Sequence, residues 1–223
     1  MNNTVDKTES TWALVPVKDF SAAKSRLSPA LSNIQCAELA ANMAADVIAA
    51  LRDCTAVDRI ACLGSGWAVR RFAAQQGCEF LAEKPGGDLS TGLNTAAKTL
   101  ERRGADTLLI VPGDLPLITS RDIDALLAAH QTGLTICPAS RDGGTNALVL
   151  SPPAAIRFRY GDDSCAQHLL AARKAGIDSQ CLEMAAFEFD IDVPADLEQL
   201  QRMNPGGQTG RFLAAPYRKV RTA

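Results

Sequence analysis

The sequence has few aromatic residues and no excess of charge of one sign. Phenylalanine, tyrosine and tryptophan make up 5% of the 223 residues, which argues against the stacking platforms that bind single-stranded nucleic acid. Lysine and arginine number 23 against 25 aspartate and glutamate, a formal net charge of −2. Because nucleic-acid binders usually carry an excess of cations on one face, we expect no nucleic-acid partner. Any bound phosphate must be met by a few placed cations.

The sequence also lacks long apolar runs and paired cysteines. It begins with the polar segment MNNTVDKTES, which does not resemble a signal peptide. No window approaches the ~20 apolar residues of a membrane span. The seven cysteines are odd in number and form no CxxC pair, which argues against a disulfide framework or a thiolate zinc site. We expect a cytoplasmic protein with reduced, mostly buried thiols and no membrane partner.

Familiar catalytic and phosphate-binding signatures are absent. There is no GxxxxGKS/T loop, which argues against a P-loop nucleotide hydrolase, and no HxxxH, HExxH or GxSxG. Gly64 and Gly66 follow a predicted strand, but the third glycine of the dinucleotide fingerprint is missing. The two histidines, His130 and His168, each lie in a predicted helix, and we interpret them as helix residues.

Strand-length apolar segments alternate with helical patterns through most of the chain. Strands are predicted at residues 12–17, 57–63, 78–82, 106–111, 134–138, 146–150, 180–182 and 187–191. Helices are predicted at residues 33–53, 67–75, 93–103, 120–130 and 165–174, and a last helix begins at Pro194. The alternation predicts an α/β fold in which helices cover both faces of a mostly parallel sheet.

No linker or internal repeat divides residues 12–203, so we predict one catalytic domain there. Residues 1–11 are a polar extension. From residue 204 the composition shifts to NPGGQTGRF, and the chain ends with four cations and no acid: Arg211, Arg218, Lys219 and Arg221. We interpret residues 204–223 as a basic tail, with a lid over an anionic substrate as the alternative.

Three aspartates follow strand-like segments, at the carboxyl ends where α/β sheets bind ligands. Asp114 comes after the run DTLLIV in the turn PGDLP. Asp190 and Asp192 alternate with apolar residues, which predicts that both carboxylates lie on one face of a strand end. Such oxygens suit magnesium, which is usually held by one or two carboxylates together with substrate phosphates. An alternative role for Asp192 is to cap the helix that begins at Pro194.

Three cations share the loop after the first predicted strand: Lys18, Lys24 and Arg26. Nucleotidyl transfer must neutralise a triphosphate and an incoming anion together, and placed cations with one or two metal ions supply that stabilisation. The simpler interpretation is a solvated basic loop, because exposed cations are common. Together with the aspartates, these cations favour nucleotidyl transfer.

Several motifs in the same order resemble one known family. They are WALVPVKDFSAAKSRLSPAL, VPGDLPL, GGTNALVLSPP, the segment around GDDSCAQH, and FDIDVPADL. Together they resemble the guanylyltransferase of coenzyme F-420 biosynthesis, and the likeness covers residues 12–200. The broader group is the nucleotide-diphospho-sugar transferase superfamily. Its members have a mixed, mostly parallel sheet with helices on both faces, a GT-A-like and Rossmann-like nucleotidyltransferase fold.

The resemblance implies a reaction and a set of site residues. GTP and a small phosphorylated carboxylic acid would give a guanylylated diphosphate and pyrophosphate; the family uses 2-phospho-L-lactate, phosphoenolpyruvate or 3-phospho-D-glycerate. Asp114, Asp190 and Asp192 would hold two magnesium ions, and Lys18, Lys24 and Arg26 would face the phosphates. Thr145, Gly161 and Ser164 match the contacts to the acid, and Asp88, Gly92 and Asn94 would approach the nucleoside.

One segment departs from the family pattern. The family commonly has a proline after the glycine and an aromatic residue after the serine, whereas here Asp162 and Asp163 lie between Gly161 and Ser164. Two acids would repel an anionic acceptor unless they meet a metal, a cation or a hydroxyl group. An acceptor with an extra hydroxyl, such as 3-phospho-D-glycerate, is therefore our hypothesis for this chain.

Three other functions stay open on the sequence alone. The first is another nucleotidyltransferase of the same fold, acting on a sugar phosphate or on molybdopterin. The second is a non-catalytic GTP-binding regulator, which would leave Asp114 and Asp190 unexplained. The third is a small module that binds an anionic partner through its basic tail. Neither the preference for guanine nor the oligomeric state is encoded in a residue pattern.

Overall fold

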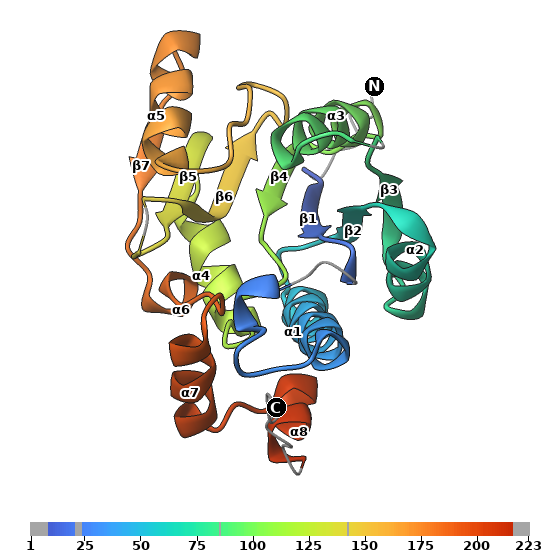
Figure 1. Ribbon diagram of the computed structural model, residues 1–223. Helices are drawn as coiled ribbons and strands as arrows, with labels where there is room; N and C mark the ends of the chain where they lie inside the picture. Colours follow the sequence, from blue (N-terminus) through green and yellow to red (C-terminus); the bar gives the residue numbers. More distant parts are fainter. Residues whose placement is uncertain (1–8, 21–23, 85, 142, 216–223) are drawn as a thin grey trace.

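The computed structural model describes residues 9–20, 24–84, 86–141 and 143–215 (Figure 1). Within them the strands are β1 (Thr11–Val17), β2 (Arg59–Gly64), β3 (Glu79–Ala82), β4 (Thr107–Ile110), β5 (Gly133–Pro138), β6 (Thr145–Ser151) and β7 (Ser179–Cys181). The helices are α1 (Asn33–Asp53), α2 (Gly66–Gln75), α3 (Leu89–Arg102), α4 (Ser120–Ala129), α5 (Ser164–Ala175), α6 (Ala185–Glu188), α7 (Pro194–Met203) and α8 (Gly207–Ala214). A short 3-10 turn, η2, covers Ser25–Leu27.

The seven strands form one sheet in the order β3-β2-β1-β4-β6-β5-β7. β1 pairs in parallel with β2 and β4, β2 with β3, and β5 with β7. β6 runs antiparallel to both of its neighbours, and Ile110 of β4 lies opposite Leu148. The predicted mixed, mostly parallel sheet is confirmed.

Successive residues of β1 explain why helices cover both faces of this sheet. Trp12 and Leu14 belong to an apolar cluster that includes residues of α3 and α5. Ala13 and Val15 point to the opposite face and belong to a cluster with residues of α1, α2 and α4. All four side chains are buried. A strand that is apolar on both faces has to be covered on both, which gives the three-layer arrangement in Figure 1.

A third apolar cluster lies away from the sheet, between η2, α1 and α7. Its buried members are Leu27, Leu31, Cys36, Leu39, Met43, Ile191, Leu197 and Leu200. Two of these residues, Leu27 and Ile191, lie next to the predicted site residues Arg26 and Asp192 in the chain. The third cluster therefore anchors the two loops that carry them.

Helix α1 is long and apolar enough, by length and composition alone, to cross a membrane, contrary to the expectation that no window approaches a membrane span. Its apolar residues Val47, Ile48 and Leu51 are fully buried in a core cluster. Ser32 caps the helix, since the backbone N–H of Gln35 donates to its hydroxyl oxygen. Burial of this face against the sheet is the packing of a core helix.

The prediction of a strand at residues 187–191 is wrong. Phe187 lies in the short helix α6, and an irregular segment leads from there to α7. The backbone partners of these residues come from separate parts of the chain: the Asn146 side chain of β6 donates to the Phe187 carbonyl at 2.7 Å, and Ile191 N–H donates to the Asp114 carbonyl in the loop after β4 at 3.3 Å. The alternating apolar residues are anchored in two clusters, Phe187 in the cluster with α1, α2 and α4 and Ile191 in the third cluster, and do not form a strand.

The prediction that the helix at Pro194 is the last one is also wrong, because α8 follows it and lies beside α1 (Figure 1). Asp46 of α1 accepts hydrogen bonds from the N–H groups of Gln208 and Thr209, each at 2.7 Å. Arg211 belongs to α8, whereas the other three cations of the predicted tail lie outside the described residues. Asp46 thus caps a helix that is distant in sequence.

We expect Asp46→Ala to lower the free energy of unfolding by about 1–2 kcal/mol, because two N–H groups at the start of α8 lose their acceptor. Urea denaturation measures the change. Asp53→Ala, at an exposed position of α1, is the matched control. It should alter the free energy of unfolding by less than about 0.5 kcal/mol. Equal stability of Asp46→Ala and the parent protein would contradict the docking of α8 through this carboxylate.

Candidate active site

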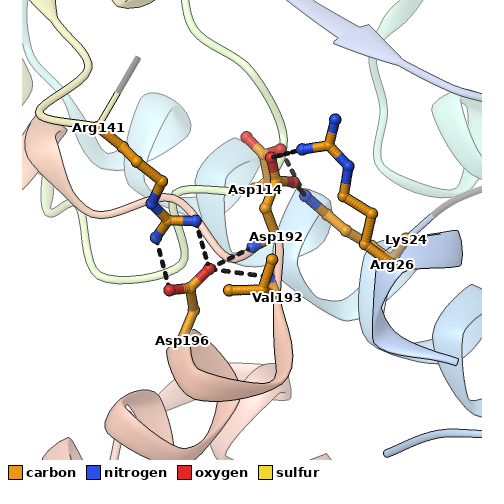
Figure 2. Close-up of polar contacts among 7 residues, drawn as sticks. All are labelled: Lys24, Arg26, Asp114, Arg141, Asp192, Val193 and Asp196. Carbon is orange, nitrogen blue, oxygen red and sulfur yellow. Dashed lines mark hydrogen bonds and ion pairs between the residues drawn. The ribbon is translucent and has the colours of Figure 1, made fainter. Parts of the chain in front are cut away.

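Three loops that are far apart in the sequence meet beside the edge of the sheet (Figure 2). Lys24 Nζ lies 2.7 Å from Asp114 Oδ2 and 2.8 Å from Asp192 Oδ1. Arg26 Nη1 lies 3.8 Å from Asp192 Oδ2. Lys18 is exposed, and its charge still acts on Asp192. The structure therefore brings two predicted carboxylates and the predicted cations together.

The local backbone directs Lys24 into this cluster. Lys24 precedes η2 and takes a left-handed conformation with φ of 55°, which costs a non-glycine residue about 1–2 kcal/mol. Leu27, at the end of η2, is fully buried and holds the turn against the third cluster. The side chain of Lys24 is only 10% exposed. Two ion pairs and a buried anchor thus maintain a backbone conformation that is unfavourable by itself.

Asp114 is held by the close approach of its loop to α1. A Cβ atom at Gly113 would stand 2.9 Å from Cβ of Ala44 and 3.3 Å from its Cα, so no side chain fits there without a shift. The Asp114 carbonyl accepts the N–H of Ile191, which ties this loop to the segment before α7. The turn after β4 therefore fixes both the aspartate and its neighbour loop.

The three predicted metal-binding aspartates experience different electrostatic surroundings. Burial raises the pKa of Asp190, and the nearby charges of Asp114 and Asp192 raise it further. Burial acts the same way on Asp192, but the ammonium of Lys24 and the guanidinium of Arg26 outweigh it and hold that pKa below its usual range. Burial disfavours the charged form of Lys24, yet its two aspartates raise its pKa. The lysine is thus a charged partner of the acids.

A separate ion pair, between Arg141 and Asp196, fixes the backbone of the segment before α7 (Figure 2). Arg141 Nη1 lies 3.0 Å from Asp196 Oδ2, and Arg141 Nη2 lies 2.5 Å from Oδ1. Asp196 Oδ2 also accepts the N–H groups of Asp192, at 2.8 Å, and Val193, at 2.9 Å. Asp196 therefore does the capping at the start of α7. The alternative role of Asp192 as the cap is wrong, because its carboxylate faces Lys24.

The three residues predicted to contact the phosphorylated acid lie together where β6 and α5 begin. Ser164 Oγ donates to Thr145 Oγ1 at 3.1 Å, and the Ser164 N–H donates to the Gly161 carbonyl at 3.2 Å. Thr145 Oγ1 also lies 3.1 Å from Nδ1 of His168. Gly161 has φ of 127°, a conformation that favours glycine. Because β6 runs antiparallel to β4, its first residues reach the edge of the sheet where β4 ends.

The residues predicted to approach the nucleoside lie on α3, which begins at Leu89 and not at residue 93. Asp88 caps this helix, and its Oδ1 accepts the Thr91 N–H at 2.6 Å. A Cβ atom at Gly92 would stand 3.0 Å from Oε1 of Glu83. The Asn94 side chain both donates to and accepts from the backbone of Phe158, at 3.0 and 2.9 Å. The structure thus gives Asp88 and Asn94 local structural partners, apart from the Lys24 cluster.

The donor set suits a hard divalent cation. Among the described residues no group of three or more His, Cys, Asp or Glu side chains is already arranged around a metal position. Asp114 and Asp192 nevertheless flank one cation position, which the Lys24 ammonium takes, and the charge of Asp190 interacts with both. Two carboxylates completed by substrate phosphates are a usual magnesium set. The residues therefore fit magnesium.

Sequence reasoning missed three residues of this region. Asp196 had a signal, since the string DVPAD is typical of a helix start and an acid at the third helical position accepts N-terminal N–H groups. Arg141 and His168 had none, because their partners lie 55 and 23 residues away in the chain. Only the folded sheet brings those partners into contact.

The architecture is that of nucleotide-diphospho-sugar transferases. A crystal structure described as a transferase of that kind, from Desulfovibrio desulfuricans, matches with a TM-score of 0.77 over 92% of this chain and 94% of its own. The two chains are 20% identical, so this likeness shows the fold alone. The likeness therefore places the chain in this fold class, with its carboxylates and cations gathered at the sheet edge.

The sequence relatives place the chain more narrowly. The family model "Guanylyl transferase CofC like" matches residues 11–219. The phosphoenolpyruvate guanylyltransferase of Sphaerobacter thermophilus is 41% identical over 198 residues, 88% of this chain and 95% of the relative. The 3-phospho-D-glycerate guanylyltransferase of Phenylobacterium zucineum is 32% identical over 207 residues, 91% and 94% of the two chains. This chain belongs to the CofC-like guanylyl transferase family, which confirms the resemblance.

Removing the carboxylate of Asp196 should destabilise the protein in a pH-dependent way. We expect Asp196→Ala to lower the free energy of unfolding at pH 7 by about 1–3 kcal/mol, because two backbone N–H groups and Arg141 lose their acceptor. Burial opposes ionisation of Asp196, but the hydrogen bonds from Arg141 and the backbone hold its pKa below the usual value. A depressed pKa stabilises the fold above the unfolded value, about 4, and that contribution is lost as the pH falls further.

Denaturation at pH 7 and at pH 3 checks this expectation. The free energy of unfolding of Asp196→Ala should lie about 1–3 kcal/mol below that of the parent protein at pH 7, and the difference should be smaller at pH 3. Glu198→Ala, on the exposed side of the same helix, serves as the control and should change stability by less than about 0.5 kcal/mol. A difference that is independent of pH would show that packing, and not the carboxylate, is responsible.

Proposed function

We propose that this chain transfers the guanylyl group of GTP to a small phosphorylated carboxylic acid and releases pyrophosphate. The acceptor is phosphoenolpyruvate, 3-phospho-D-glycerate or 2-phospho-L-lactate, and the reaction serves coenzyme F-420 biosynthesis in the cytoplasm. The observation that carries the proposal is the position of Lys24 between Asp114 and Asp192, since phosphate transfer needs such placed charges. Family membership supports the guanylyl donor, and the names of the relatives support the acceptor class.

The chemistry needs no side-chain base. A phosphate oxygen of the acceptor attacks the α-phosphorus of GTP, a new P–O bond forms, and the bond to the pyrophosphate oxygen breaks. The nucleophile is already an anion, so no proton has to be removed. The protein therefore acts mainly by positioning the two substrates and compensating their charge.

The carboxylates and cations divide this work. Asp114, Asp190 and Asp192 would hold magnesium, two ions in all. When bound, magnesium would compensate the negative charge of the phosphoryl oxygens. Lys24 would then exchange its aspartate partners for phosphate oxygens, beside Lys18 and Arg26. The ion pairs of Lys24 keep its ammonium charged and close to that position.

The hydroxyl group of Thr145 would bind the acceptor, beside Ser164, whose own hydroxyl hydrogen is donated to Thr145 Oγ1. Ser164 opens α5 and donates to Thr145 of β6 beside it, and the dipole of a helix of 12 residues favours anions at its amino end. Gly161 would approach the acid through its backbone. Asp88, Gly92 and Asn94, at the start of α3, would line the nucleoside site.

Substitution of the metal-binding aspartates tests the proposal. We expect Asp114→Asn and Asp190→Asn each to reduce guanylyl transfer by at least about 10²–10³-fold, because each removes charge that the reaction needs. Pyrophosphate release with GTP, magnesium and each of the three acids gives the rate, and mass spectrometry identifies the product. Asp53→Asn, exposed at the end of α1, is the control, and circular dichroism checks that each variant folds.

Two results would count against the proposal. Near-normal rates in either aspartate variant would defeat the metal assignment. Failure of the parent protein to use any of the three acids would defeat the acceptor class and favour a sugar phosphate or molybdopterin. Preferential use of phospholactate would contradict the hypothesis that Asp162 and Asp163 select an acceptor with an extra hydroxyl group.

Removing Lys24 should separate metal binding from catalysis. Without nucleotide, the ammonium competes with a divalent ion for Asp114 and Asp192, so Lys24→Met should bind Mn²⁺ about tenfold more tightly than the parent protein, a change of about 1.4 kcal/mol. Guanylyl transfer should nevertheless fall by about 10²-fold, because a cation for the phosphates is lost. Electron paramagnetic resonance of free Mn²⁺ measures the affinity.

The control for this experiment is Lys98→Met, at an exposed position of α3. It should change neither Mn²⁺ affinity nor turnover. If Lys24→Met binds Mn²⁺ no better than the parent protein, Lys24 and the metal do not share one position.

A further inference from the structure

The protonation pattern of His168 follows from its hydrogen bonds. The Arg159 backbone N–H donates to His168 Nε2 at 3.0 Å. A backbone N–H can only donate, so Nε2 is the unprotonated nitrogen of the ring. The side chain is fully buried, and burial lowers the pKa of His168 to about 4, which leaves the ring neutral at pH 7. A neutral imidazole carries one N–H, and here it must be on Nδ1.

The protonated nitrogen of His168 controls the hydroxyl group of Thr145. Nδ1 lies 3.1 Å from Thr145 Oγ1, and Ser164 Oγ donates to the same oxygen at 3.1 Å. A hydroxyl oxygen accepts two hydrogen bonds, so these two donors fill both lone pairs. The remaining group is the hydroxyl hydrogen of Thr145, which can only donate.

The packing around His168 keeps the ring in this orientation. The ring contacts Tyr160 edge to face, with 5.0 Å between centroids, and Phe158 in the same manner at 6.1 Å. Thr145 retains 7% exposure, and it opens β6 at the sheet edge beside the loop of Asp114. A fixed hydroxyl donor therefore lies where an anionic substrate would approach.

We propose that His168 is a positioning residue that fixes the Thr145 hydroxyl as a hydrogen-bond donor to the phosphorylated acid. The inference deepens the proposed function and rests on it, because that function assigns Thr145 to the acceptor. His168 does not touch the acid itself. It acts through Thr145, and its partner Arg159 sets which ring nitrogen carries the hydrogen.

Two substitutions of His168 distinguish this role from simple packing. The side-chain amide of asparagine reaches the place of Nδ1 and can still donate to Thr145, whereas that of glutamine reaches the place of Nε2 and cannot. We expect His168→Gln to raise KM for the acid about tenfold and to leave KM for GTP unchanged. His168→Asn should restore KM for the acid to within about threefold of the parent value.

The second histidine provides the control. His130 lies between Thr135 Oγ1 and Ser151 Oγ, each 2.9 Å away, at the opposite end of β6. His130→Gln should leave both KM values unchanged. The ¹⁵N NMR spectrum of His130→Gln lacks the His130 signals and so identifies those of His168 in the parent protein. At pH 7 these should show a ring protonated on Nδ1 and not on Nε2.

The outcomes separate this inference from the proposed function. A parent protein that uses none of the three acids overturns the proposed function and the acid assignment with it. If the parent protein does use an acid, an Nε2-protonated ring overturns the inference alone. Equal KM for the acid in His168→Gln and His168→Asn overturns it as well, and so does a parallel rise in both KM values.

Discussion

The reversed direction of β6 is the constraint on which the candidate site depends. In a parallel sheet, ligands meet only the carboxyl ends of the strands, but β6 runs antiparallel to β4 and brings its first residues to the same edge. Thr145 therefore lies near the loop of Asp114, although it begins a strand. The reversal joins the charged cluster around Lys24 to the hydroxyl group of Thr145 and Ser164. One edge of the sheet can in this way hold both partners of a group transfer.

The charged cluster also explains how a protein of net charge −2 can handle phosphates. Burial, and then the nearby carboxylates of Asp114 and Asp192, raise the pKa of Asp190. Lys24 offsets part of the repulsion among these carboxylates through two ion pairs, at the cost of its own desolvation. The carboxylates of this cluster suit a divalent cation, and the ammonium of Lys24 suits a phosphate anion. Local arrangement, and not the overall charge, sets the affinity for phosphate.

The sequence predicted those features of the site that depend on neighbouring residues. The strand before Asp114 and the α/β alternation follow local patterns, and the structure bears them out. The prediction of a strand at residues 187–191 failed because their backbone partners come from β6 and from the loop after β4. The helix α8 was missed because its glycine-rich start is a poor helix former, while its cap, Asp46, lies 162 residues from Gln208. Tertiary contacts decided each case that local patterns got wrong.

The two halves of the site meet negative charge by different means, and this bears on selectivity. Around Lys24 the partners are full charges, which attract any phosphate regardless of its shape. Around His168 they are neutral donors, whose strength depends on the position of the acceptor atom. The three candidate acids all carry a phosphate and a carboxylate, so attraction between charges discriminates little among them. A buried hydroxyl with a fixed direction does discriminate, because a substrate that leaves it unpaired loses affinity. In the proposed function, Thr145 and the neutral ring behind it therefore contribute to selection of the acid, together with the effect that we hypothesise for Asp162 and Asp163.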